Sequence, residues 1–245
     1  MSAAAVQGWV LAVTATLGPL LGLLLGLFKY FNYKTKRDRR AAVGAFFSAT
    51  VEALASDNEV RRMVAAVLLR RFFDQKTEQG EVGTPYREET IEVIAGMIRE
   101  TQPERLQKVL ADGLRYARDL RGADLQRCKL RNSYLGRKGG DEFSVDLSNA
   151  DLYEADCSGA SFKAAIAVGT IFYRATLERT VFTEANLEGA DFRSTKLSGA
   201  KFDGARISGA MFEGAEGIPV EVARLLDEKH VDLTDTIVPT GSGTR

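Results

Sequence analysis

Apolar side chains recur every fifth residue through much of the C-terminal half of the chain. The central positions of these repeats are Leu147, Leu152, Cys157, Phe162, Ala167, Phe172, Leu177, Phe182, Leu187, Phe192, Leu197, Phe202, Ile207 and Phe212. A small residue, most often alanine, stands two positions before most of them. A helix repeats every 3.6 residues and a strand every two, so a period of five predicts a repeat architecture.

The repeats resemble the pentapeptide-repeat family, whose units read A-(D/N)-(L/F)-x-x. The nearest matches are Ala150-Asp151-Leu152, Ala185-Asn186-Leu187-Glu188-Gly189 and Ala190-Asp191-Phe192. The same register holds earlier, at Leu120, Leu125, Leu130 and Leu135. The resemblance implies a right-handed quadrilateral β-solenoid over residues 117–217, with four pentads in each coil. The glycine-rich, charged stretch between the two blocks predicts a loop near residues 136–143.

The phenylalanines support a coil of four pentads. Residues twenty positions apart would then stack at roughly 4.8 Å, the spacing between paired strands. One side would carry Phe162, Phe182 and Phe202, and the opposite side Phe172, Phe192 and Phe212. We therefore expect a core of two facing phenylalanine ladders with aliphatic walls between them.

The pentads stop after Gly217, and the pattern then changes to that of a helix. Residues 218–230 carry an apolar stripe of Val222, Leu225 and Leu226, which predicts a short helix covering the last coil. Residues 231–245 end in a polar, glycine-containing stretch and are expected to form a flexible tail.

The N-terminal part has a long apolar run. Residues 8–28 contain no charged side chain, which predicts a transmembrane helix after a short tail of residues 1–7. A cleaved signal peptide and a buried soluble helix are weaker alternatives, because residues 1–7 lack a basic side chain and no charges mark a solvent face.

A basic stretch follows the apolar run in residues 29–40. Its positive side chains are Lys29, Lys34, Lys36, Arg37, Arg39 and Arg40. Positive residues stay on the cytoplasmic side, so we expect a single-pass protein with its N-terminus outside and all later domains in the cytoplasm. The same side chains would also contact anionic lipid headgroups.

Three glycines lie on one face of the expected span. Gly18, Gly22 and Gly26 recur every fourth residue, a spacing that lets two membrane helices approach closely. The chain is therefore a candidate homo-oligomer within the membrane.

Residues 41–116 read as a helical domain of short amphipathic helices, similar in pattern to HEAT-like hairpins. Ser56 and Glu59 form a capping-box signal before one of these helices. The apolar residues on one face of this helix are Val60, Met63, Val64, Val67, Leu68 and Phe72. The simplest role for this domain is to cap the open end of the solenoid and connect it to the membrane.

The chain offers no group of residues suited to catalysis, and we expect it not to be an enzyme. Its one histidine, His230, stands alone, and Cys128 and Cys157 fall at inward repeat positions as small buried side chains. No metal-ligand spacing or phosphate-binding loop is present, so neither a metal nor another cofactor is expected. The aspartates of the repeats follow its period and are expected to bond local backbone.

One part of the repeat surface departs from the polar pattern and is a candidate protein interface. Its outward residues are Tyr153, Ile166, Val168, Ile171, Tyr173 and Val181. Exposed apolar patches often mark binding sites. Irregular coil geometry, or a covering domain or second copy, would give the same pattern without a partner.

Three functions are consistent with these features. The first is a membrane-anchored scaffold that presents the solenoid to a cytosolic protein or to itself. The second is a self-assembling membrane effector in stress or antiphage defence, acting through its transmembrane helix. The third is DNA mimicry, known for gyrase-binding members of the resembled family. Residues 118–217 carry 14 basic and 15 acidic side chains, a balance that disfavours a DNA-like surface and any nucleic-acid partner.

Overall fold

The computed structural model describes Leu27, Lys29 and residues 34–77, 79–80, 86–137 and 143–227. The chain divides into two compact units, Met1–Phe46 and Phe47–Arg245. No helix among the described residues is both long and apolar enough to span a bilayer.

Several sequence predictions fall outside the described residues. These are the terminal tails, His230, and the expected span with Gly18, Gly22 and Gly26, of which Leu27 alone is described. The basic residues of the expected linker are described, with exposed side chains. Those from Lys34 to Arg40 belong to a helix over residues 34–54, where the sequence predicted a linker.

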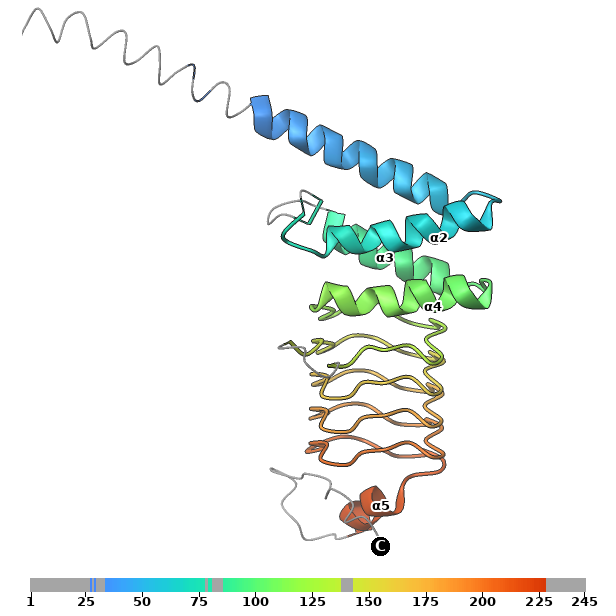
Figure 1. Cartoon of the computed structure of the whole chain (residues 1–245). Helices are drawn as coiled ribbons and strands as arrows, with labels where there is room; N and C mark the ends of the chain where they lie inside the picture. Colours follow the sequence, from blue (N-terminus) through green and yellow to red (C-terminus); the bar gives the residue numbers. More distant parts are fainter. Residues whose placement is uncertain are drawn as a thin grey trace, which may run out of the picture. The chain divides into compact units, whose positions relative to one another are not determined.

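The repeats form stacked coils joined by parallel β-bridges (Figure 1). From the second coil onward, each bridge joins residues twenty positions apart, as in Asp146 with Ile166 and Ile166 with Asn186. The coil of four pentads is therefore confirmed. The four faces carry, in order, the bridge residues 119, 146, 166, 186 and 206; 124, 151, 171, 191 and 211; 129, 156, 176, 196 and 216; and 134, 161, 181 and 201.

The offset between bridged residues is larger at the first coil. Asp119 pairs with Asp146 and Tyr134 with Ser161, an offset of 27 residues. The insertion between the two repeat blocks thus adds seven residues to a coil. Leu135 and Leu147 are twelve residues apart, which reads from the sequence as two pentads and two extra residues. In the structure this interval is one pentad and seven extra residues.

Each corner of a coil is a β-turn that follows the central residue. At one such corner the Ala150 N–H donates to the Leu147 carbonyl at 2.9 Å. Asn149, the third residue of this turn, has a φ of 58°, as a type II turn requires. The small residue then turns back into the core, which explains why alanine is so frequent two positions before each centre.

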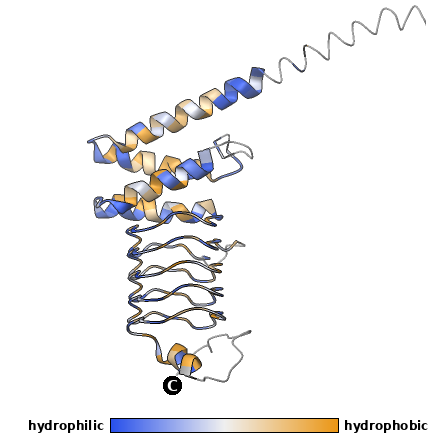
Figure 2. Ribbon diagram, turned by 180° about the vertical axis from the view of Figure 1, so that it is seen from behind, coloured by the Kyte–Doolittle hydropathy of each residue, from blue (hydrophilic) through white to orange (hydrophobic). Residues whose placement is uncertain are grey.

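Two phenylalanine ladders fill the core, and their rings are fully or nearly fully buried. Phe162, Phe182 and Phe202 stack at 5.3 and 5.1 Å, and Phe172 and Phe192 stack at 5.0 Å in the facing ladder. The two ladders also meet edge to face, with Phe172 and Phe182 at 5.6 Å. Figure 2 shows the resulting alternation of hydrophobic and hydrophilic residues around each coil.

Helices precede and follow the solenoid within the larger unit (Figure 1). Their bounds are α2 Glu59–Leu68, η1 Leu69–Phe72, α3 Tyr86–Arg99, α4 Glu104–Gly113, η2 Leu114–Ala117 and α5 Val220–Asp227. Asn58, rather than Ser56, caps α2, its side chain accepting from the Arg61 N–H at 2.9 Å. Leu69, Ile94, Ile98 and Leu110 are fully buried in the core of this helical layer.

α3 and α4 close the open edge of the first coil with hydrogen bonds. The Lys129 N–H donates to the Ile98 carbonyl at 2.9 Å, and the Gln107 amide donates to the Lys129 carbonyl at 2.7 Å. The Tyr134 N–H donates to the Asp112 carboxylate at 2.9 Å. Because an unpaired strand edge is a site of aggregation, these contacts protect the end of the solenoid.

Candidate protein-binding surface

The third coil has an unusual outer surface. Its bridge residues are Ile166, Ile171, Thr176 and Val181, whereas each of the other described coils carries at least one charged residue at these positions. Ile166 is 39% and Ile171 37% exposed, and both project from adjacent faces. β-branched residues favour strand pairing, but their exposure here also provides an apolar surface for another molecule.

Two tyrosines border Ile171 at the next corner. The Tyr153 and Tyr173 rings stack with centroids 5.9 Å apart and an interplanar angle of 25°. They come from successive coils at equivalent repeat positions, so the solenoid register itself places them together. We name Tyr153, Ile166, Val168, Ile171 and Tyr173 the Ile–Tyr surface.

Charged side chains hold the tyrosine pair in place. The guanidinium of Arg174 lies 5.3 Å from the Tyr173 ring centre, and its Nη1 contacts the Tyr153 hydroxyl at 3.4 Å. Glu154 forms an ion pair with Arg127 at 3.0 Å. The pKa of Glu154 is lowered, first by hydrogen bonding with the Tyr153 side chain and then by that with Arg127. The tyrosine pair is therefore bordered by paired charges.

The remaining predicted interface residue lies elsewhere. Val181 is on the fourth face, whereas Ile171 is on the second, at the opposite side of the coil. Val181 is half-buried between Ser161 and Lys201 of its own ladder. The interface predicted from sequence is therefore not one continuous surface, because the five-residue period distributes outward residues over four directions.

Arg193 connects the tyrosine pair to a buried carboxylate. Its guanidinium lies 5.6 Å from the Tyr173 ring centre and forms two hydrogen bonds with Asp191, at 2.9 and 2.7 Å. The side chain of Asp191 is only 10% exposed. Hydrogen bonding from Arg193, the largest effect, lowers the pKa of Asp191.

This pair predicts a pH dependence of stability. A carboxylate with a lowered pKa stabilises the folded state above its unfolded pKa of about 4, and loses that contribution as pH falls through the lower folded value. Asp191→Asn should thus lower the free energy of unfolding by about 1 kcal/mol at pH 7. The difference from the unaltered chain should shrink as the pH falls below about 4.

Urea unfolding across this pH range measures the effect. Glu178→Gln, at an exposed turn of the neighbouring coil, is the matched control and should show a smaller difference at pH 7. A constant difference between the unaltered chain and Asp191→Asn at every pH would contradict the assigned role of the charge.

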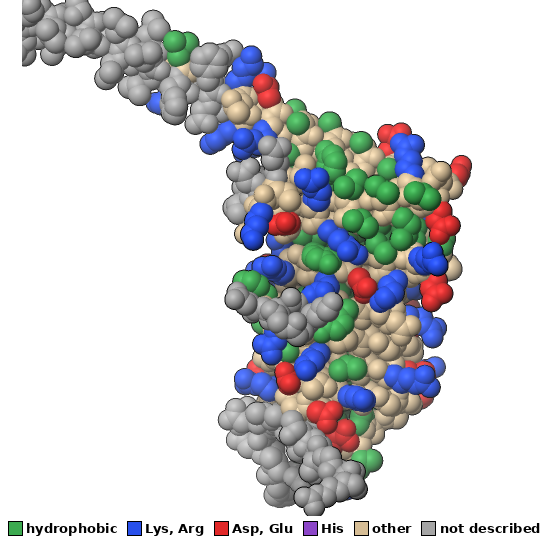
Figure 3. Space-filling view, viewed as in Figure 1, with side chains coloured by type: hydrophobic (Ala, Val, Ile, Leu, Met, Phe, Trp, Pro, Cys, Tyr) green, Lys and Arg blue, Asp and Glu red, His purple; other side chains and the backbone are tan. Residues whose placement is uncertain are grey.

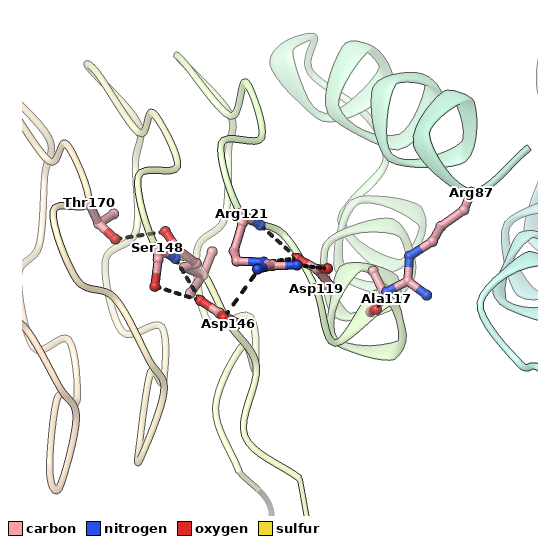
Figure 4. A network of polar contacts seen from close by, with 8 residues as sticks. Arg87, Ala117, Asp119, Arg121, Asp146, Ser148 and Thr170 are labelled. Atoms are coloured by element: carbon pink, nitrogen blue, oxygen red, sulfur yellow. Dashed lines mark hydrogen bonds and ion pairs between the residues drawn. The ribbon is translucent and has the colours of Figure 1, made fainter. Parts of the chain in front are cut away.

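A groove of about 990 Å³ lies between α3 and the first two coils. Charged residues of this groove pair with one another (Figure 4). Arg121 donates to both carboxylate oxygens of Asp119, at 2.9 and 2.8 Å, and its Nε lies 3.8 Å from the Asp146 carboxylate. Arg121 lowers the pKa of Asp119 to about 2. Arg87 donates to the Ala117 carbonyl. These contacts join the first two coils to each other and α3 to η2, and we assign the groove a structural role.

The aspartates of the repeats bond local backbone, as predicted. Asp146 accepts from the Ser148 N–H at 2.9 Å, and Asp151 accepts from the Tyr153 N–H at 2.9 Å. Within the described part of the chain, no group of three or more His, Cys, Asp or Glu side chains is arranged to hold a metal ion. Burial raises the pKa of the Cys128 thiol to about 12.

A second apolar surface lies on α2. Val60, Val64 and Val67 are 72%, 53% and 48% exposed, although the sequence groups them on one apolar face with Phe72, which is buried. Figure 3 shows hydrophobic side chains gathered on the helical part, with charged ones around them. The buried side of this segment is instead formed by Ala65, Ala66, Leu69 and Phe72. Small alanines let neighbouring helices approach, so they displaced the valines from the core.

These features define the chain as a β-solenoid repeat protein with a helical cap. The sequence profile of the family described as "Pentapeptide repeats (8 copies)" matches residues 144–179 and 170–209. The repeat region thus matches the pentapeptide-repeat family, whose members fold as right-handed β-solenoids.

Solved structures of pentapeptide-repeat proteins are similar to part of the chain. Rfr23 from the cyanobacterium Cyanothece 51142 shares 31% identity over 40% of this chain and 58% of its own, with a TM-score of 0.32. HetL from Nostoc sp. strain PCC 7120, involved in heterocyst differentiation regulation, shares 26% identity over 40% of this chain and 48% of its own, with a TM-score of 0.20. The chain thus spans about half the length of these two proteins. No curated protein matches the sequence.

Proposed function

We propose that this chain is a non-catalytic scaffold whose solenoid binds a protein through the Ile–Tyr surface. The observation that carries the proposal is the exposure of Ile166 and Ile171 beside a stacked tyrosine pair. Aromatic residues with arginines around them are frequent among the residues that dominate binding energy at protein interfaces. A partner would bury the isoleucines at the centre and contact the charged residues at the rim.

The rigidity of the solenoid favours this role. Tyr173 is held between neighbouring arginines and stacked on Tyr153, so little side-chain freedom would be lost on binding. The rim is mixed in charge, with Asp151 beside Ile171 in its ladder and Arg174 and Arg193 near Tyr173. This composition suits a protein partner better than a nucleic acid, which requires a strongly basic surface.

We further propose that the chain is anchored in a membrane by residues 8–28, with the later domains in the cytoplasm. The uncharged run and the basic residues that follow it support this proposal. A self-assembling membrane effector is the second candidate, supported by the spacing of Gly18, Gly22 and Gly26.

A single lysine tests the Ile–Tyr surface. In Ile171→Lys the new charge would lie between Asp151 and Asp191 in the ladder, so the solenoid should still fold. Burying this charge in an interface costs free energy because the lysine loses its hydration. A cost of about 1.4 kcal/mol lowers the affinity tenfold, so the affinity for the partner should fall at least tenfold. The measurement is affinity capture of the full chain from native membranes in mild detergent, quantified by mass spectrometry.

The matched control is Thr176→Lys, at the equivalent position on the next face, between Asp156 and Lys196. The proposal expects a partner that is captured by the unaltered chain and by Thr176→Lys and lost from Ile171→Lys. Equal capture by all three forms would exclude the Ile–Tyr surface. Recovery of the chain alone, as a discrete oligomer, would favour the self-assembling effector.

A further inference from the structure

The valine stripe of α2, made of Val60, Val64 and Val67, has the spacing of a helix–helix seam. The steps of four and three residues are those of alternating a and d positions in a coiled coil. All three side chains are exposed, at 72%, 53% and 48%, while the other side of the helix packs into the cap. A second helix with the same spacing would bury an exposed seam of this kind.

Charged residues at the two ends of the valine stripe indicate which helix fits. Asp57 lies just before α2 and Arg71 just after it, both exposed and each seven residues from Val64. If a second α2 lies antiparallel with Val64 at the centre, Asp57 of each copy faces Arg71 of the other. A parallel arrangement would place like charges opposite each other and would be disfavoured.

We propose that the valine stripe is a two-fold symmetric contact between two copies of this chain, formed by antiparallel packing of their α2 helices. Such an isologous contact is the commonest type in homodimers. It uses a different surface from the proposed partner site on the third coil, so either proposal can fail without the other. Three valines form a small contact, well below the area of a stable interface, and we expect weak dimerisation.

Disulfide trapping of the full chain in native membranes tests the geometry. Val64→Cys lies on the two-fold axis and should link to itself under mild oxidation. Val60→Cys and Val67→Cys should each link poorly alone but efficiently when the two variants are co-expressed, because Val60 of one copy would lie near Val67 of the other. Cys128 and Cys157 are buried and should stay reduced.

The matched control for random collision is Val220→Cys on α5, which is 63% exposed.

A second test reverses the charges at the ends of the valine stripe. Asp57→Arg should reduce the Val64→Cys dimer severalfold, Arg71→Asp should do the same, and the combination should restore it, since only the inter-copy pair is re-formed.

Three results would overturn the proposal. Linking of Val64→Cys no faster than Val220→Cys would exclude a contact between copies. Equal self-linking of Val60→Cys, Val64→Cys and Val67→Cys would show a parallel arrangement. Shielding of an unlinked Val64→Cys from a water-soluble maleimide by vesicles of anionic lipid alone would assign the stripe to the membrane surface.

Discussion

Phe182→Asp is expected to abolish cooperative folding of the solenoid. Phe182 is fully buried, stacks on Phe162 and Phe202, and meets Phe172 and Phe192 edge to face at 5.6 Å each. Aspartate would place an unpaired charge among these four rings and leave a cavity. Loss of a buried phenylalanine alone costs about 3–5 kcal/mol, and the charge adds several more. The sum is comparable to the whole stability of a domain, about 5–15 kcal/mol.

Far-UV circular dichroism and thermal melting of the purified full chain measure this loss. Thr183→Asp, one residue further at a half-buried turn position, is the matched control and should melt close to the unaltered chain. An unchanged melting transition for Phe182→Asp would mean that the ring is not inside the solenoid.

Ile98→Asp should have the second-largest effect, confined to one end of the molecule. Ile98 is fully buried, and its carbonyl accepts the Lys129 N–H of the first coil. The buried charge should unfold α3 and α4 and free the edge of that coil, at a cost of several kcal/mol. Because each coil contacts only its neighbours, residues 165–204 should stay folded.

Hydrogen exchange read by mass spectrometry distinguishes the two parts. In Ile98→Asp, amides of α3, α4 and the first coil should exchange rapidly while those of the third and fourth coils keep their protection. Glu100→Asp, which introduces no new charge at an exposed position two residues away, should behave as the unaltered chain. Loss of protection along the whole solenoid would show that the cap and coils form one cooperative unit.

The solenoid could be predicted in detail because the same period of five identifies every core position. Phe162 and Phe182 are twenty residues apart, which is the interval between bridged residues, so their stacking could be predicted from the sequence alone. The length of the insertion was harder to predict. The twelve residues from Leu135 to Leu147 can be two pentads with two extra residues or one pentad with seven.

The surface was less predictable than the core. Periodicity showed that Val181 points outward but not that it lies opposite Ile171, which depends on following the coil around its four faces. In α2 the sequence showed one apolar face that included the valines, whereas Ala65 and the following Leu69 are buried in the structure. Which side packs inward depends on the neighbouring helices, and no pattern within one helix contains that information.

The insertion after the first coil also shows how such a chain can acquire new parts. Asp119 and Asp146 pair as closely as residues of an uninterrupted coil, although seven additional residues precede Asp146. A corner can therefore accept extra chain without a change of register on the faces, whereas an insertion within a face would turn each later side chain toward a wrong direction. The insertion between the first and second coils is thus the natural site for grafting a peptide tag or recognition loop while the stacked coils remain intact.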